Sequence, residues 1–180
     1  MAFNVAEFRA NMIGDGARPN LFQVSLTFPT IAANGSAAGQ KVSFMAKSAQ
    51  LPGSTVGTVP VYYFGRELKF AGNRTFTDWT LQIINDEDFV IRNSLESWMN
   101  SINSHTTNVR SAAAVNPASY SVDAVVTQYG KAGQELKSYK FVGLFPLDIA
   151  AIDLDWGSND SIEEYGVTFA FQYWESNTTS

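Results

Sequence analysis

Residues 72–102 carry two hydrophobic periodicities back to back, and this stretch limits the possible folds more than any other. In its first part apolar side chains alternate with polar ones, as in a strand that buries one face: Trp79, Leu81 and Ile83. In its second part apolar side chains recur at the spacing of one helix stripe: Ile91, Leu95, Trp98 and Ile102. Between the two parts, Asn85 or Asp86 can cap the free N–H groups of the first helical turn. The pattern predicts a strand followed by one principal helix at about residues 86–102.

Most of the remaining chain has the patterning of strands. Alternation predicts strands over residues 21–28, 120–126 and 165–173, and a strand over 135–145 that forms a hairpin with 120–126. A second hairpin is expected from residues 61–64 and 67–70 around Gly65 and Arg66. Residues 31–40 are expected to form a loop, and 41–46 a strand. Two proline and two glycine residues between positions 51 and 60 predict an extended loop at about 47–59.

The chain shows no internal repeat and no linker, so we expect a single domain over residues 1–180. Its fold class is mainly β, with the one principal helix. Residues 1–18 are predicted to form an N-terminal arm with scattered apolar side chains, among them Phe3 and Phe8. The sequence leaves two alternatives open for this arm: it packs on its own domain, or it lies on a neighbouring subunit.

Residue types that support catalysis are scarce. Cysteine is absent, which excludes disulfides and thiolate metal sites. His105 is the single histidine, so a metal site with a pair of histidines is excluded and a His-based catalytic triad is not expected. Nucleotide-binding and hydrolase motifs are also absent. Asp86, Glu87 and Asp88 resemble a Ca²⁺ or Mg²⁺ ligand set, but helix capping accounts for them. We therefore expect no enzyme activity, no cofactor and no metal; paired carboxylates that cleave glycosides remain an open alternative.

Charge is unevenly distributed along the chain. Residues 1–141 carry 12 basic and 10 acidic side chains, a net of +2, whereas residues 142–180 carry seven acidic and none basic, a net of −7; together they give −5. Proteins that bind nucleic acid tightly are usually basic, so this balance argues against such a role. No run of about 18 apolar residues exists, and the N-terminus lacks a signal-peptide core. We expect synthesis in a cytosol and no membrane insertion.

Three segments together resemble the tail tube protein of contractile-tailed bacteriophages: LPGSTVGTV at 51–59, GNRTFTDW at 72–79 and NDEDFVIRNSLESW at 85–98. Through that family the chain is similar to the haemolysin-coregulated tube protein of type VI secretion. The resemblance covers nearly the whole sequence. It implies two packed antiparallel sheets that form a β-barrel or sandwich, flanked by the principal helix.

The same resemblance implies a structural function. Six copies would form a ring, and rings would stack head to tail into a hollow tube that conducts DNA into the host. The implied partners are further copies of the chain, the tail sheath protein, the baseplate or tube initiator, the tape-measure protein and the tail terminator. The implied location is the virion, after synthesis in the host bacterial cytoplasm. The alternative is a tube or carrier subunit of a type VI secretion-like or other contractile injection system.

Contacts between subunits are expected to use charge. The hypothesis is that the acidic segment 148–164 of one subunit faces Lys47, Arg66 or Arg110 of another, and that loop 47–59 reaches onto an adjacent subunit. The interface candidates combine these charged groups with the arm and the loop: Phe3, Phe8, Lys47, Ser54, Thr55, Val56, Arg66, Arg110, Asp153, Asp155 and Glu163.

Overall fold

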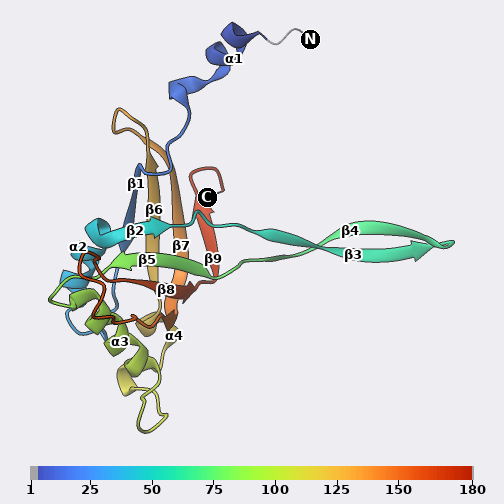
Figure 1. The fold of residues 1–180 in the computed structure, drawn as a ribbon. Helices are drawn as coiled ribbons and strands as arrows, with labels where there is room; N and C mark the ends of the chain where they lie inside the picture. The colour runs from blue at the N-terminus through green and yellow to red at the C-terminus, as the bar shows by residue number, and fades with distance from the viewer. Residues whose placement is uncertain (1–3, 180) are drawn as a thin grey trace.

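The computed structural model describes residues 4–179 and is built mainly of antiparallel strands (Figure 1). In chain order its elements are α1 (Val5–Asn11), η1 (Ile13–Asp15), β1 (Phe22–Leu26), α2 (Gly35–Met45), β2 (Ala46–Ala49), β3 (Thr55–Tyr63), β4 (Arg66–Thr75), β5 (Trp79–Ile84), α3 (Val90–Ile102), η2 (Ala112–Ala114), α4 (Pro117–Tyr120), β6 (Val122–Tyr129), β7 (Glu135–Ile149), β8 (Glu164–Ala170) and β9 (Tyr173–Ser176).

Seven strands form two packed layers that share β7. The first layer, called sheet I here, contains β1, β6, the first part of β7 and β9; the second, sheet II, contains the last part of β7, β8, β5 and β2. In Figure 1 the strands of the two sheets cross at a steep angle. The change of partner falls beside Gly143, whose φ of 69° favours glycine. The predicted fold class, mainly β with two packed antiparallel sheets, is confirmed.

The core lies between the two sheets and beneath α3. Alternate residues of the central strands are buried there, as the period-2 patterning predicted: Val24, Leu26, Leu81, Ile83, Ala124, Val126, Val167 and Phe169. Helix α3 contributes Ile91, Leu95 and Trp98, which are buried, while Ile102 packs at the margin of the core. The Trp98 indole N–H donates to Tyr120 O at 2.8 Å, so even this large side chain leaves no polar atom unpaired.

Helix α3 begins at Val90, later than the predicted residue 86. Its N-terminal N–H groups are not capped by Asn85 or Asp86; instead the Asp88 carboxylate accepts from the Val90 N–H at 3.1 Å. Asn85 is buried and donates to the Glu163 carboxylate at 2.9 Å, and Asp86 accepts from Lys41 Nζ at 2.5 Å. The predicted caps Asn85 and Asp86 are engaged by tertiary partners, so the capping contact falls to Asp88.

Helix α2 replaces the loop and strand predicted over residues 31–46. It buries only Ala38 and Val42, one turn apart, so its apolar stripe is too weak to read as a helix. Its small residues let it lie close to β1: a Cβ at Gly39 would meet Leu26 O at 3.0 Å. Close packing against β1 therefore stabilises a helix whose sequence has a low helix propensity and a weak apolar stripe.

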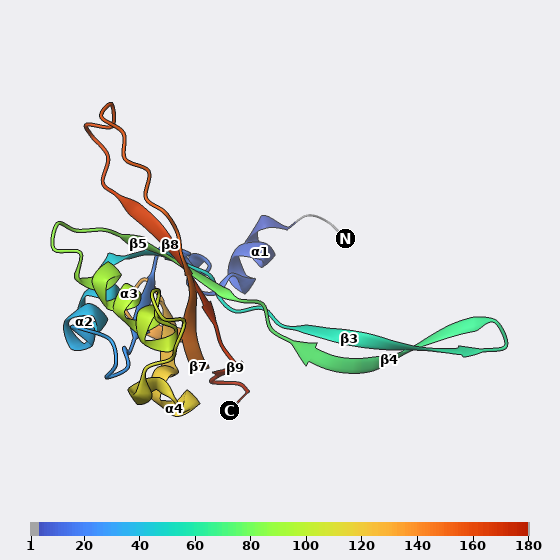
Figure 2. The same cartoon turned by 90° about the horizontal axis from the view of Figure 1, so that it is seen from below.

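The hairpin predicted around Gly65 and Arg66 exists but is much longer. Strands β3 and β4 pair from Tyr63 and Arg66 at the tip to Thr55 and Thr75 at the base. The extended loop predicted over 47–59 is therefore wrong: its ends belong to β2 and β3, and only residues 50–54 connect them. Figures 1 and 2 show the hairpin extending far to the right of both sheets.

The predicted last strand over 165–173 is divided between the two sheets. Strand β8 pairs with β5 and β7 in sheet II, and after Phe171 and Gln172 the chain enters sheet I as β9. The inward positions change parity at the corner: Tyr165, Val167 and Phe169 are buried in β8, whereas in β9 Trp174 packs against the core and Tyr173 is exposed. The run of alternating aromatic residues up to Tyr173 therefore predicted one strand where the chain changes sheets.

We predict that Leu95→Ala lowers the free energy of unfolding by about 3 kcal/mol, because Leu95 is fully buried and the cavity cannot collapse between α3 and the sheets. Chemical denaturation followed by far-UV circular dichroism measures the change. Asn93→Ala, at an exposed position of the same helix, is the control and should change stability by less than about 1 kcal/mol. Equal effects at the two positions would contradict the packing of α3.

The ion-pair cluster of Lys41 with Asp86 and Asp88 predicts a pH dependence of stability. The hydrogen bond from Lys41, helped by the Val90 N–H, lowers the pKa of Asp88 from 3.8 to about 2. Because the folded-state pKa is the lower one, this contribution is present above pH 3.8 and is lost as pH falls toward 2. Lys41→Met should therefore destabilise the protein at pH 6 and much less at pH 2, as measured by urea denaturation. Lys69→Met removes a lysine without an ion pair among residues 4–179, and its effect should not vary with pH in this range.

Candidate assembly surfaces

The described residues contain little that could act chemically. Between Asn4 and Thr179 no group of three or more His, Cys, Asp or Glu side chains is arranged to hold a metal ion. His105 is exposed on the connection after α3, and its backbone N–H donates to Asn100 Oδ1 at 3.2 Å. No helix within residues 4–179 is both long and apolar enough to cross a membrane. The features that stand out are surfaces, not reactive centres.

The outer face of sheet I is polar. Since Val24, Ala124, Val126 and Phe141 point into the core, the residues between them point outward. We call this outward surface the wall face; its polar members are Gln23, Ser25, Asp123, Thr127, Tyr129, Glu135, Ser138, Lys140, Tyr173 and Glu175. Most are uncharged, so the surface offers hydrogen bonds to water and only a weak field.

Charges on the wall face are partly compensated. Lys140 Nζ lies 2.8 Å from the Asp123 carboxylate, and Glu175 lies opposite Lys140 in the register of β9 with β7. Partial burial acts to raise the pKa of Asp123, but hydrogen bonds from Lys140 and from the Gly143 N–H outweigh it, so the pKa lies below its usual value. With Glu135, which is paired with Tyr129, the four charges sum to −2 at neutral pH.

Sheet I has two open edges. Strand β1 pairs only with β6 at one edge, and β9 pairs only with β7 at the other. The Tyr129 N–H bonds Leu21 O, so the backbone groups of alternate β1 residues from Phe22 onward point away from β6. Helix α2 packs beside the end of β1, leaving an open groove of mixed character, whose lining includes Gln23, Ser25, Gln40 and Ser43 as well as Leu26, Phe28 and Ala32. Such edges can accept a strand of another chain.

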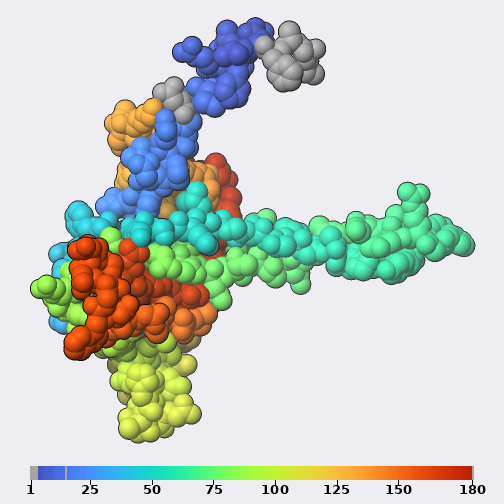
Figure 3. All heavy atoms as spheres, viewed as in Figure 1, coloured from blue at the N-terminus to red at the C-terminus, as the bar shows by residue number. Residues whose placement is uncertain are grey.

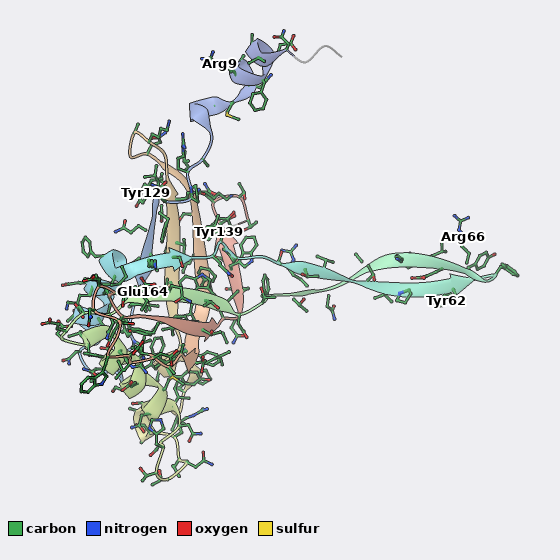
Figure 4. All side chains as sticks on the ribbon, viewed as in Figure 1. Arg9, Tyr62, Arg66, Tyr129, Tyr139 and Glu164 are labelled. Carbon is green, nitrogen blue, oxygen red and sulfur yellow. The ribbon has the colours of Figure 1, made fainter. Side chains whose placement is uncertain are left out.

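The β3–β4 hairpin has one apolar face, and no other part of the described chain covers it. Directly paired residues share a face, and the register places Val59 opposite Phe70 and Val61 opposite Leu68. Between 42% and 55% of each of these four side chains is exposed. Figure 3 shows the hairpin as a narrow arm, and Figure 4 shows Tyr62 and Arg66 near its tip. Because an isolated two-stranded hairpin is marginally stable in water, the β3–β4 hairpin needs a partner.

The segment between β7 and β8, residues 150–163, is also uncovered. It carries apolar side chains in the open: Leu154, Trp156 and Ile162 are 80%, 100% and 71% exposed. Asp153 and Asp155 are exposed as well. The end of the segment is fixed, because the Asn85 N–H donates to Glu163 O at 2.8 Å and Asn85 Nδ2 to the Glu163 carboxylate. Residues 150–163 are called the acidic loop below.

The predicted interface candidates lie in several places. Lys47 pairs with Glu164 of its own chain at 2.6 Å, and Glu163 is held by Asn85, so neither is a free charge that awaits a partner. Arg110 is exposed, with its guanidinium 5.1 Å from the Tyr120 ring centroid. Ser54, Thr55 and Val56 are exposed at the base of the hairpin.

The N-terminal arm stands away from both sheets in Figures 1 and 3. Asn4 caps α1 by accepting from the Ala6 N–H at 3.1 Å. No residue of this helix is buried, and Phe8 is 64% exposed. Phe3 lies outside the described residues. A seven-residue helix is too short to be stable alone in water, so the arm, like the hairpin, lacks its supporting surface here.

Sequence reasoning missed the most exposed apolar side chain, Trp156, because a tryptophan normally indicates core packing. It also missed the apolar face of the hairpin, whose residues 55–60 it read as loop. Both could have been recognised from apolar residues that lie among prolines, glycines or carboxylates and belong to no strand or helix pattern. Such residues have no buried face of their own and indicate exposed apolar surface.

Known proteins are similar over nearly the whole chain. A family model described as "Phage tail tube protein" matches residues 17–177. The tail tube protein gp19 of Enterobacteria phage T4 is 34% identical over 168 residues, covering 93% of this chain and 96% of the relative, and that of phage T6 is 35% identical over the same share. A chain of the sheath-tube complex of an extracellular contractile injection system has the same fold, with a TM-score of 0.60, 16% identity and coverage of 98% and 99%.

We predict that backbone amides of residues 55–75 exchange with deuterium on the order of 100-fold faster than those of β6 and β7 in the unassembled protein. The hairpin lacks buried contacts, whereas β6 and β7 carry the core residues Ala124, Val126 and Phe141. Hydrogen-exchange mass spectrometry measures both segments in one sample, so the β6–β7 hairpin is the internal control. Equal protection of the two hairpins would show that β3–β4 is stable without a partner.

Proposed function

This chain belongs to the phage tail tube protein family, and from that premise we propose that six copies close into a ring and that rings stack head to tail into a hollow tube. The protein is a structural component of a contractile phage tail. The observation that carries the proposal is sheet I: its inner face belongs to the core, its outer face is polar, and both of its edges are open.

Ring closure follows from the open edges. An edge strand that stays open invites uncontrolled pairing, and a closed ring of sheets removes both edges of every subunit at once. Pairing β1 of one copy with β9 of the next joins the six copies of sheet I into one continuous barrel. The groove beside β1 gives the incoming strand room, and the polar side chains in its lining suit exposed backbone groups.

The wall face lines the lumen in this arrangement. It presents hydroxyl and amide groups with a net charge of −2 per subunit from Asp123, Glu135, Lys140 and Glu175. DNA binding depends on basic side chains that neutralise phosphates, and this surface offers a single lysine that is already paired. DNA therefore passes through the lumen without specific binding, because nothing on the wall holds it.

The remaining partners are those of a contractile tail. The tube carries the sheath on its outside, starts on the baseplate or its initiator, takes its length from the tape-measure protein and ends at the terminator. The role requires no catalysis and no cofactor, consistent with a chain that has one exposed histidine and no cysteine. The relatives at 34–35% identity are phage tail tube proteins, which favours the phage tail over the related injection systems.

Contacts between copies use the uncovered surfaces. The N-terminal arm, which stands away from both sheets in Figure 1, contacts an adjacent subunit through Phe8, and the base of the hairpin contacts one through Ser54, Thr55 and Val56, which are all exposed. Of the basic candidates, Arg66 and Arg110 are free to face the acidic segment of another copy, whereas Lys47 is satisfied within its own chain. Asp153 and Asp155 supply the exposed carboxylates on the other side of such a contact.

The test is electron microscopy of assembled protein with a thiol-specific gold label. Because the chain has no cysteine, Ser138→Cys puts a single label site on the wall face, and Asn93→Cys puts one on the exposed side of α3. We expect stacked rings with a central hole, gold inside the bore for Ser138→Cys and outside the tube for Asn93→Cys. A protein that stays monomeric at high concentration, or gold outside the tube for Ser138→Cys, would overturn the proposal.

A further inference from the structure

The apolar face of the β3–β4 hairpin is left uncovered by residues 4–179, and it also carries charge. Arg66 shares that face with Leu68 and Phe70, and Lys69 and Arg74 lie on the other face. Against one acidic residue, Glu67, these three give the hairpin a net charge of +2. None of the three basic side chains forms an ion pair within the described part of the chain.

The acidic loop has the complementary composition. Between residues 150 and 163 it contains four carboxylates and no basic side chain, a net of −4. Leu154, Trp156 and Ile162 provide exposed apolar surface among those carboxylates. The acidic loop therefore has the two properties that a partner surface for the hairpin needs: negative charge and uncovered apolar groups.

The two segments cannot meet within one molecule. In both Figure 1 and Figure 2 the hairpin extends to the right of the sheets, and the acidic loop projects on the left. Two complementary patches on opposite sides of one subunit make a heterologous contact, in which each copy offers its hairpin to one neighbour and its acidic loop to another. Every copy then covers both of its own exposed segments.

We propose that the apolar face of the hairpin docks on the acidic loop of a second copy of this chain. Trp156 packs among Val59, Val61, Leu68 and Phe70, and Asp153 and Asp155 face Arg66, which shares this face. This inference rests on the proposed self-assembly and names the surfaces that make one of its contacts. Aromatic anchors surrounded by a charged rim are typical of specific interfaces.

Engineered disulfides test the contact directly, because the natural chain has no cysteine. Leu68→Cys protein is mixed with Leu154→Cys protein, assembled into tubes and oxidised mildly, and dimers are counted on non-reducing gels. We expect at least about tenfold more cross-linked dimer in tubes than in the same mixture kept unassembled, since the contact raises the local thiol concentration. Leu68→Cys mixed with Val115→Cys, an exposed site outside the acidic loop, is the matched control.

The outcomes separate this inference from the proposed function. Tubes of normal appearance without the Leu68–Leu154 cross-link, or with a Leu68–Val115 cross-link instead, would overturn the inference and leave the tube intact. Unmodified protein that never forms rings would overturn the proposed function itself.

Charge reversal gives an independent readout. Arg66→Glu should raise the protein concentration needed for assembly by about tenfold, and Asp153→Lys with Asp155→Lys should do the same. Combining all three substitutions restores opposite charges across the contact, so assembly should return to within a few-fold of the unmodified protein. Circular dichroism confirms that each variant is folded. Failure of the combined variant to recover, with the fold intact, would contradict the pairing.

Discussion

Strand β7 belongs to both sheets, and the rest of the architecture depends on that sharing. Its 15 residues are enough to pair with β6 and β9 first and with β8 afterwards, and the turn in direction is made beside Gly143. Because the two layers cross, the core is enclosed on two sides while sheet I keeps both of its edges and its whole outer face. If β7 continued straight, the strands would form one flat sheet whose apolar face would be uncovered, and sheet I would have no separate wall face.

The same arrangement explains why so much apolar surface stays uncovered. Side chains of the sheets and of α3 fill the core, and Leu81, Val167 and Phe169 are fully buried in it. Trp156, Phe64 and Phe8 lie on segments that leave this core altogether. Soluble monomers rarely expose large apolar groups together with unsupported backbone, whereas a subunit can complete its fold with its neighbours. Exposure here is a property of the isolated chain.

The sequence was sufficient wherever a segment packs against the core on one face. Strands β1, β5, β6 and β8 and helix α3 follow this rule, and the alternation or stripe that predicts them is the direct record of burial. Segments that pack by close approach or face solvent on both sides leave no such record. Helix α2 relies on Gly39 against β1, and the hairpin has no buried residue. The helix was therefore predicted as a loop and a strand, and only the tip of the hairpin was predicted as paired strands.

The candidate surfaces were predicted less well than the fold, because a charged residue does not reveal its partner. Lys47 and Glu164 are 117 positions apart and meet only through the pairing of β2, β5 and β8. Of the residues chosen for charge, those on segments outside the sheets, such as Arg66 and Asp155, kept their charges free. The useful criterion is therefore topological: a charge on a segment that no other part of the described chain covers is available to another chain.

Open edges raise the question of why such a chain does not aggregate as it folds. The open edge strands of sheet I are short, five residues in β1 and four in β9, and each offers only a few backbone hydrogen bonds. A single edge contact is therefore weak, and it becomes strong only when the hairpin and arm contacts form on the same neighbour. Assembly that needs several weak contacts at once is slow in free solution and fast on an existing ring. Short edges with distant accessory segments thus favour growth from a nucleus over uncontrolled pairing.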